Sequence, residues 1–230
     1  MKLLALDTCT ERISLALQVD QVRHVISEPG GARASARLIP AIQELLAQAD
    51  LPLTALDAIV VGVGPGSFTG LRSAVAVAQG LAMGADLPLL PFDSLLALAE
   101  DVRQRALAGK AHVRVQALLD ARMGQIYAAR YVFDSGSWSN DGACSLIQPE
   151  ALECVPGELC AGNARAAYGA RLPLGDAPWV DALPESSAML DLAPTMIRAG
   201  LAQAPELVLP HYVRDKVALT SAERARGLRL

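Results

Sequence analysis

The sequence has little of what a metal enzyme or a nucleophilic enzyme needs. Its three histidines, His24, His112 and His211, are far apart, and no H-x-x-x-H or H-E-x-x-H pattern occurs. No G-x-S-x-G nucleophile motif is present either. The four cysteines form no C-x-x-C pair, which predicts free thiols in a reducing cytosol. We therefore expect no bound metal, no cofactor and no catalytic nucleophile.

Positive charge is also scarce, because 20 Lys and Arg residues face 24 Asp and Glu residues and the net charge is −4. A protein that grips RNA phosphates over a broad surface needs a clustered basic face, so direct RNA binding is not expected. The longest weakly charged stretch, residues 58–85, is interrupted by Pro65 and Arg72 and does not read as a membrane span. The first apolar run ends early, at Asp7. These features predict a soluble cytoplasmic protein without membrane contact.

What the sequence does have is apolar residues, 52% of the chain, enough for a sizeable core. Short apolar runs alternate with segments of helical periodicity, which is typical of an α/β fold. Ser35 and Asp93 are plausible N-caps for two of the helices. In the first half we expect strands at residues 3–7, 13–19, 58–63 and 87–90, and helices at residues 35–49, 69–83 and 95–107.

The second half starts after a charged, glycine-containing segment, residues 103–110, which indicates a boundary. Each half contains a hairpin followed by helical segments, so the sequence predicts two related lobes. The first lobe would be residues 1–103, joined by the C-terminal segment 211–230, and the second residues 104–210. Within the second lobe we expect strands at 113–119 and 125–133, a polar surface loop at 135–142, a short strand at 159–161 and a helix at 188–199.

Two segments resemble a nucleotide site that has degenerated. In nucleotide-binding folds of the actin, Hsp70 and sugar-kinase type, the first hairpin turn cradles phosphate, and close backbone approach usually requires glycine. The turn after Asp7 has no glycine, and Glu11 would repel phosphate. Residues 64–70 contain three glycines before a helix but no P-loop lysine, so either anion binding or tight strand-to-helix packing explains them. The positions of this degenerate site are Asp7, Thr8, Thr10, Gly64, Gly66 and Ser67.

The predicted helix at residues 69–83 is apolar on every face, with Arg72 as its only charge. Such a helix is buried all round, either in the centre of this chain or in a helix bundle with a partner, together with the helix at 35–49. A partner interface would also make the isolated chain pair with itself as a homodimer. On this hypothesis a charge at Ala78 abolishes pairing without unfolding the monomer. The predicted interface residues are Leu38, Ile42, Leu45, Leu46, Gly70, Leu71, Arg72, Ala74, Val75, Ala78, Leu81 and Ala82.

Five segments spread along the chain resemble the TsaB (YeaZ) family in order and spacing. They read LALDT at 4–8, GPGSFTGLR at 64–72, AQGLA at 78–82, LDARMGQIY at 119–127 and PHYVR at 210–214. The resemblance implies a two-lobed, actin/Hsp70-like (ASKHA) α/β fold with mixed sheets flanked by helices. One departure is Ala34, which stands where the family commonly has histidine before the first long helix.

The resemblance also implies a role in making threonylcarbamoyladenosine (t6A) next to the anticodon of tRNA. A TsaB-like protein is a pseudo-enzyme that activates a homologous, metal-carrying catalytic subunit, TsaD, through a helix bundle, and a small ATPase, TsaE, joins them. This chain would contact tRNA only indirectly or within the complex. The basic tail after His211 is either a solvated end or a contact to tRNA phosphates. The rival hypothesis is an ATP-dependent kinase or carbamoyltransferase of the same fold that uses Asp7 and residues 64–70.

Overall fold

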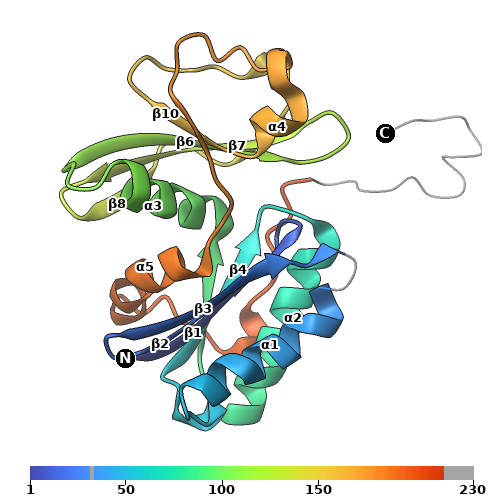
Figure 1. The fold of residues 1–230 in the computed structure, drawn as a ribbon, viewed down its shortest axis with the longest axis vertical. Helices are drawn as coiled ribbons and strands as arrows, with labels where there is room; N and C mark the ends of the chain where they lie inside the picture. The colour runs from blue at the N-terminus through green and yellow to red at the C-terminus, as the bar shows by residue number, and fades with distance from the viewer. Residues whose placement is uncertain (32–33, 215–230) are drawn as a thin grey trace, which may run out of the picture.

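Two mixed sheets, one in each lobe, organise the structure, a computed structural model that describes residues 1–31 and 34–214 (Figure 1). The first sheet has the order β3-β2-β1-β4-β5 and the second β11-β10-β6-β7-β8, with β9 paired to β7. The strands of the first sheet are β1 (Lys2–Asp7), β2 (Arg12–Val19), β3 (Val22–Pro29), β4 (Ala58–Gly64) and β5 (Leu89–Asp93). Those of the second are β6 (His112–Asp120), β7 (Ile126–Asp134), β8 (Ser137–Asn140), β9 (Ser145–Ile147), β10 (Leu159–Gly162) and β11 (Trp179–Asp181).

Strand β1 lies at the centre of the first sheet because nearly all of its side chains are apolar and buried on both faces. It pairs antiparallel with β2 and parallel with β4, so the predicted hairpin is confirmed. The edge strand β3, which continues the hairpin antiparallel to β2, was not predicted. Its exposed and half-buried residues alternate, and its polar composition gives only a weak strand signal.

Four helices cover the two faces of the first sheet. Helices α1 (Ala34–Gln48) and α2 (Phe68–Ala85) lie side by side on one face, and α5 (Ser186–Arg198) covers the other together with α3 (Ser94–Ala106) (Figure 1). Met189, Leu190 and Ala193 of α5 pack against Leu3 and Ala5 of β1. Residues 186–198 therefore belong with the first lobe and not, as predicted, with the second, because the sheet's second face needs an apolar cover.

The second sheet packs α3 against one face and α4 (Ala164–Tyr168) with its neighbouring loops against the other. Part of the predicted polar loop at 135–142 is instead the strand β8, antiparallel to β7. Trp138 anchors this strand, with its ring centroid 5.2 Å from that of Phe133 and 6.3 Å from that of Tyr131. The aromatic contacts supply the burial that the polar sequence of β8 lacks.

Cap residues fix where the helices of the site begin. Asp93 caps α3 as predicted, because its carboxylate accepts from the backbone N–H of Leu95 at 2.9 Å. Ser67 caps α2, with its hydroxyl accepting from the N–H of Gly70. Helix α1 already includes Ala34, so Ser35 lies in its first turn and is not the predicted N-cap.

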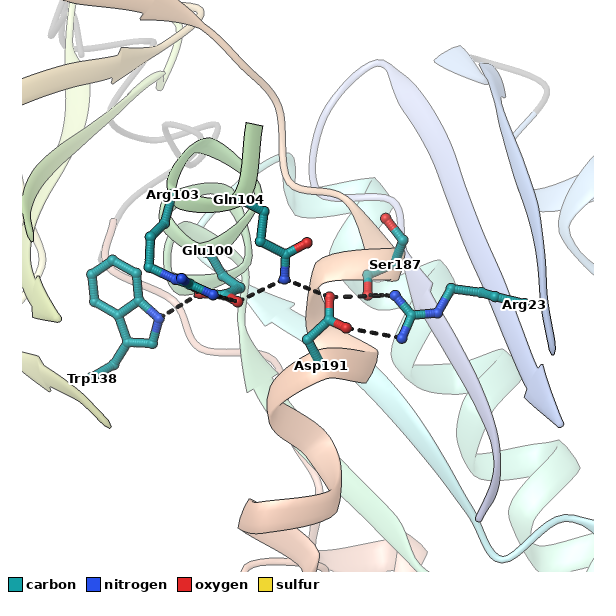
Figure 2. Close-up of polar contacts among 7 residues, drawn as sticks. All are labelled: Arg23, Glu100, Arg103, Gln104, Trp138, Ser187 and Asp191. Carbon is teal, nitrogen blue, oxygen red and sulfur yellow. Dashed lines mark hydrogen bonds and ion pairs between the residues drawn. The ribbon is translucent and has the colours of Figure 1, made fainter. Parts of the chain in front are cut away.

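A chain of polar contacts joins the two lobes through α3 (Figure 2). The Glu100 carboxylate, whose residue is 1% exposed, accepts from the indole N–H of Trp138 in the second lobe at 2.8 Å and from Gln104 at 2.7 Å. Gln104 also donates to Asp191 of α5 at 2.7 Å, and Asp191 pairs with Arg23 of β3 at 2.9 Å. The Arg103 guanidinium lies 2.7 Å from the buried Glu100 carboxylate and balances its charge. The chain of contacts thereby links the two lobes on this side.

Candidate functional site

Asp7, at the end of β1, points into the core and not into the space between the lobes. One carboxylate oxygen accepts from the Ser94 hydroxyl at 2.6 Å and the other from the Cys9 N–H at 2.7 Å. Burial raises the pKa of Asp7 above its usual range. A Cβ at Gly62 would lie 1.9 Å from the same carboxylate, so this glycine makes room for Asp7. The acidic group is therefore tied into the fold by its own neighbours.

The glycine loop at residues 64–70 is packed directly on the first hairpin turn. A Cβ at Gly66 would lie 2.4 Å from the Cys9 carbonyl oxygen, and one at Gly70 would lie 1.9 Å from that of Thr8. The N–H of Ser67 donates to the Cys9 carbonyl at 2.6 Å. The Thr8 hydroxyl donates to the Gly70 carbonyl at 2.8 Å. Of the two explanations left open by the sequence, tight packing accounts for Gly66 and Gly70.

A cleft of about 490 Å³ separates this packed turn from the second lobe. Four of the predicted degenerate-site positions line it: Thr8, Thr10, Gly66 and Ser67. The first-lobe wall consists mainly of hydroxyl side chains and loop backbone. The opposite wall comes from the β6–β7 turn and from residues far along the chain, and it contains Leu119, Asp120, Ala121, Arg122, Met123, Tyr127, Asn163 and Arg214.

The β6–β7 turn carries the Asp–Arg pair that the sequence indicated. The Asp120 carboxylate accepts from the Arg122 N–H at 2.7 Å, and the Arg122 guanidinium lies 3.2 Å from its other oxygen. Arg122 and Met123 both have positive φ, 61° and 56°, in a conformation that non-glycine residues rarely adopt. The Asp120 contacts hold this strained turn at the rim of the cleft.

Two residues that hold Asp120 in place were not predicted, because they come from more distant parts of the chain. The Tyr168 hydroxyl donates to the Asp120 carboxylate at 2.6 Å, and Asn163 accepts from the Asp120 N–H at 2.8 Å. Burial and the Asp120 hydrogen bond raise the pKa of Tyr168 to about 12. The pairing of β10 with β6 brings Asn163 and Tyr168 to Asp120, and no local sequence motif predicts this pairing.

The structure buries eight of the twelve predicted interface residues inside the chain's own core. Leu46, Gly70 and Leu81 are half-buried, and Arg72 is exposed. We call the buried face of α2 its inner strip, made of Leu71, Ala74, Val75, Ala78 and Ala82. The three other buried residues, Leu38, Ile42 and Leu45, lie on the matching face of α1. A charge at Ala78 is therefore expected to disrupt the monomer, contrary to the hypothesis drawn from the sequence.

A different face of α2 is exposed, and we call it the outer strip: Thr69, Arg72, Ala76, Gly80 and Met83. Their spacing of three or four residues places them along one side of the helix. Met83 of the outer strip is 61% exposed, and Ile39 of the neighbouring helix α1 is 45% exposed. Of the two predicted alternatives, burial of the whole helix inside this chain is therefore excluded, and burial of the outer strip by a partner stays a prediction.

An aromatic cluster holds Arg72 at the N-terminal end of the outer strip. The Arg72 guanidinium lies 3.8 Å from the centroid of the Phe68 ring, and its Nε donates to the Tyr212 hydroxyl at 2.8 Å. The Phe68 and Tyr212 centroids are 5.2 Å apart. Arg72 was predicted as an interface residue, but its partner Tyr212 was not predicted because it follows 140 residues later. Arginine and tyrosine are residue types that often dominate interfaces.

The described part of the chain shows neither a metal centre nor an exposed Cys9 thiol. Within residues 1–31 and 34–214, no group of three or more His, Cys, Asp and Glu side chains is placed to hold a metal ion. Cys9 is 2% exposed, and burial raises its pKa well above the usual range. No helix in the same part of the chain is long and apolar enough to cross a bilayer. The predicted basic tail beyond Arg214 lies outside the described residues.

Two lobes built around mixed sheets, with a cleft between them and the first hairpin turn at its edge, define the actin/Hsp70-like (ASKHA) class of proteins. Two solved structures from Pseudomonas aeruginosa share this whole architecture at 33% identity. One is YeaZ, with a TM-score of 0.83, covering 92% of this chain and 99% of that one. The other is described as an uncharacterized protein with similarity to peptidase YeaZ, with a TM-score of 0.84 and coverages of 93% and 99%.

Sequence comparison gives the family. The chain is 34% identical over 229 residues to the tRNA threonylcarbamoyladenosine biosynthesis protein TsaB of Escherichia coli K12, covering 95% of this chain and 96% of that protein. It is 42% identical over 132 residues to TsaB of Haemophilus influenzae, covering 57% and 54%. Residues 19–165 match the family described as TsaD, tRNA N6-adenosine threonylcarbamoyltransferase. The chain belongs to the TsaB/YeaZ family, which is related to the TsaD family.

Proposed function

We propose that this chain is a non-catalytic activator in t6A biosynthesis. It would promote threonylcarbamoyl transfer to N6 of the adenosine next to the anticodon by pairing with a TsaD-like catalytic subunit, and a TsaE-like ATPase would join the assembly. Membership of the TsaB/YeaZ family supports the pathway. Support for a role without chemistry comes from the first hairpin turn.

The observation that carries the non-catalytic role is the packing of that turn against the glycine loop. A phosphate-binding turn needs free backbone N–H groups that point at the ligand. Here the Ser67 N–H is already bonded to the Cys9 carbonyl, and the Asp7 carboxylate is bonded to Ser94 and Cys9. Binding a nucleotide as related kinases do would require breaking these contacts, so the site favours a structural role over catalysis.

The proposed partner surface is the outer strip of α2 together with the exposed side of α1. Ala76 and Gly80 are small and would let a partner helix approach the α2 backbone closely, as in ridge-and-groove packing. Ile39 and Met83 add exposed apolar side chains, and the Arg72 cluster adds an ordered charge at one end. In the absence of the catalytic subunit, the same surface would pair two copies of this chain.

Reconstitution tests the proposal. Unmodified tRNA, threonine, bicarbonate, ATP and the purified partner subunits are combined with and without this chain, and modified adenosine is measured. We expect modification to depend on this chain and the chain alone to modify nothing. Equal modification without it would contradict the activator role. Thermal protection of the isolated chain by Mg-ATP would instead support the rival ATP-dependent kinase or carbamoyltransferase.

A matched pair of variants tests the surface. Ala76→Glu places a charge in the outer strip, and Ala167→Glu makes the same change at an exposed position on α4 of the second lobe. Both should leave the thermal midpoint of the monomer nearly unchanged, because exposed substitutions typically stay within about 0.5 kcal/mol. Only Ala76→Glu should lose pairing and activation. Normal partner binding by Ala76→Glu would exclude this face and leave the pathway assignment intact.

A further inference from the structure

Two of the four cysteines lie against each other in the second lobe. The Sγ atoms of Cys154 and Cys160 are 3.9 Å apart. Cys160 sits in β10, fully buried between β6 and β11, and Cys154 is half-buried in the loop that leads to this strand. Two thiols in van der Waals contact can be joined by small rotations about their side-chain bonds, since a disulfide requires an S–S distance of about 2 Å.

The loop between the two cysteines can adapt while its ends are held. It turns through a hydrogen bond from the Glu158 N–H to the Val155 carbonyl at 3.1 Å, and the exposed Gly157 has a φ of +85°. The Glu153 carbonyl, just before Cys154, accepts from Gln116 of β6 at 3.1 Å. The Cys154 side is therefore anchored to the same strand that β10 pairs with, which keeps the two sulfur atoms adjacent.

The other two cysteines serve as internal controls. Cys9 is buried in the first hairpin turn, and Cys144 is half-buried like Cys154, with its thiol directed to the Ser145 carbonyl at 3.8 Å. All four are free thiols. Cys144 matches Cys154 in burial class but has no thiol beside it, and burial raises its pKa to about 12. Cys144 therefore reports on oxidation of a half-buried thiol elsewhere in the lobe, and Cys160→Ser reports on the pairing.

We propose that Cys154 and Cys160 form a reversible intramolecular disulfide when the protein meets hydrogen peroxide. The Cys154 thiolate attacks one peroxide oxygen, the O–O bond breaks, and the products are a sulfenic acid on Cys154 and hydroxide, which takes up the thiol proton as water. The Cys160 sulfur then displaces the sulfenic oxygen, which leaves as a second water with the Cys160 proton. Two thiols and one peroxide thus give one disulfide and two waters.

The order of the two steps follows from burial. Burial is the main cause that raises the pKa of Cys160 to about 12, so this thiol is protonated at neutral pH and is a poor first nucleophile. Cys154 is less buried and meets the oxidant first. Since the pair is in the second lobe, away from α1 and α2, its oxidation neither requires the partner nor depends on the proposed function.

The test uses the full chain, treated with hydrogen peroxide and then denatured for thiol counting and unreduced peptide mapping. We expect the count to fall by two, with one cross-link between Cys154 and Cys160 that dithiothreitol reverses. Cys144→Ser should still form it. In Cys160→Ser, oxidation of Cys154 should stop at a sulfenic acid, which dimedone traps. If Cys160→Ser fails to fold, Cys154→Ser is the second variant, and its remaining thiols should stay free after peroxide treatment. Absence of the cross-link, or oxidation of Cys144 as fast as Cys154, would overturn the proposal.

Discussion

The two faces of α2 both have small residues at their centres but have opposite environments. The inner strip is at most 3% exposed and packs on β4 and α1. The outer strip has alanine and glycine at its centre, and both of these residues are exposed. Apolar composition therefore does not tell which face is internal. The same substitution made on each face distinguishes an effect on folding from an effect on the proposed interface.

The comparison also explains why small residues occur on both faces. On the inner strip, Ala74 and Ala78 let α2 lie close to the sheet, and both are fully buried. On the outer strip, Ala76 and Gly80 are exposed, and among the described residues a Cβ at Gly80 would have no atom within 4 Å. Close packing on the sheet explains the small size of Ala74 and Ala78. Close approach of the proposed partner would explain the small size of Ala76 and Gly80.

The largest effect is expected from Ala78→Glu on the inner strip. The new carboxylate would be buried among apolar side chains without a partner, and the longer side chain would also overpack the helix–sheet contact. We expect a loss of at least about 4 kcal/mol in the free energy of unfolding, which is a large part of the stability of a typical domain. Urea unfolding followed by circular dichroism measures it.

Ala76→Glu is the control for that experiment, since it makes the same change two positions away on the opposite face of the helix. It should unfold at nearly the urea concentration of the unsubstituted chain. A folded, stable Ala78→Glu variant would show that the inner strip is not a packed core, and the distinction between the two faces would fail.

Much of the fold could be predicted because its elements have strong local signals. The central strands β1 and β4 are continuous apolar runs, and α3 begins at the Asp93 cap, so each was located to within a few residues. Strands β3 and β8 were missed because they are polar edge strands, with little burial to mark them in sequence. The return of α5 to the first lobe depends on long-range packing that no local pattern records.

The site was predictable only where neighbours in sequence are neighbours in space. The turn at Asp120 and Arg122 is such a case. Tyr168 and Asn163 reach Asp120 only through the pairing of β10 with β6, and Tyr212 reaches Arg72 from the far end of the chain. Helical periodicity could not separate the inner from the outer strip, since Ala76 and Gly80 of the outer strip resemble the alanines of the inner one.

A smaller effect is expected for Gly80→Ala in the outer strip, which should raise the stability of the monomer and weaken its pairing with the partner. Alanine should stabilise the exposed helix by about 0.5 to 1 kcal/mol, and no atom of residues 1–31 or 34–214 lies within 4 Å of the added methyl group. If a partner helix packs closely there, the same methyl should weaken pairing by about 1 kcal/mol or more, which is roughly fivefold in Kd. Thermal unfolding and sedimentation with the catalytic partner give the two values.

The matched control is Ala76→Gly, which removes a methyl group from the same strip. It should lower the thermal midpoint for the same backbone reason and should not crowd a partner helix. Stability and pairing that both rise in Gly80→Ala would show that the partner does not approach this part of α2, and would move the interface toward α1.

The smallest effect is expected for Tyr212→Phe, which removes the hydroxyl that accepts from Arg72 and keeps the ring beside Phe68. Tyr212 is 42% exposed, so the lost hydrogen bond should lower the free energy of unfolding by about 0.5 kcal/mol or less. Pairing should weaken by a few fold at most, because Arg72 is less ordered before it binds. Titration calorimetry of this variant and of Tyr212→Ala measures the contribution of the cluster. Complete loss of pairing in Tyr212→Phe would mean that the hydroxyl itself contacts the partner, whereas unchanged pairing in both variants would restrict the interface to the small residues of the outer strip.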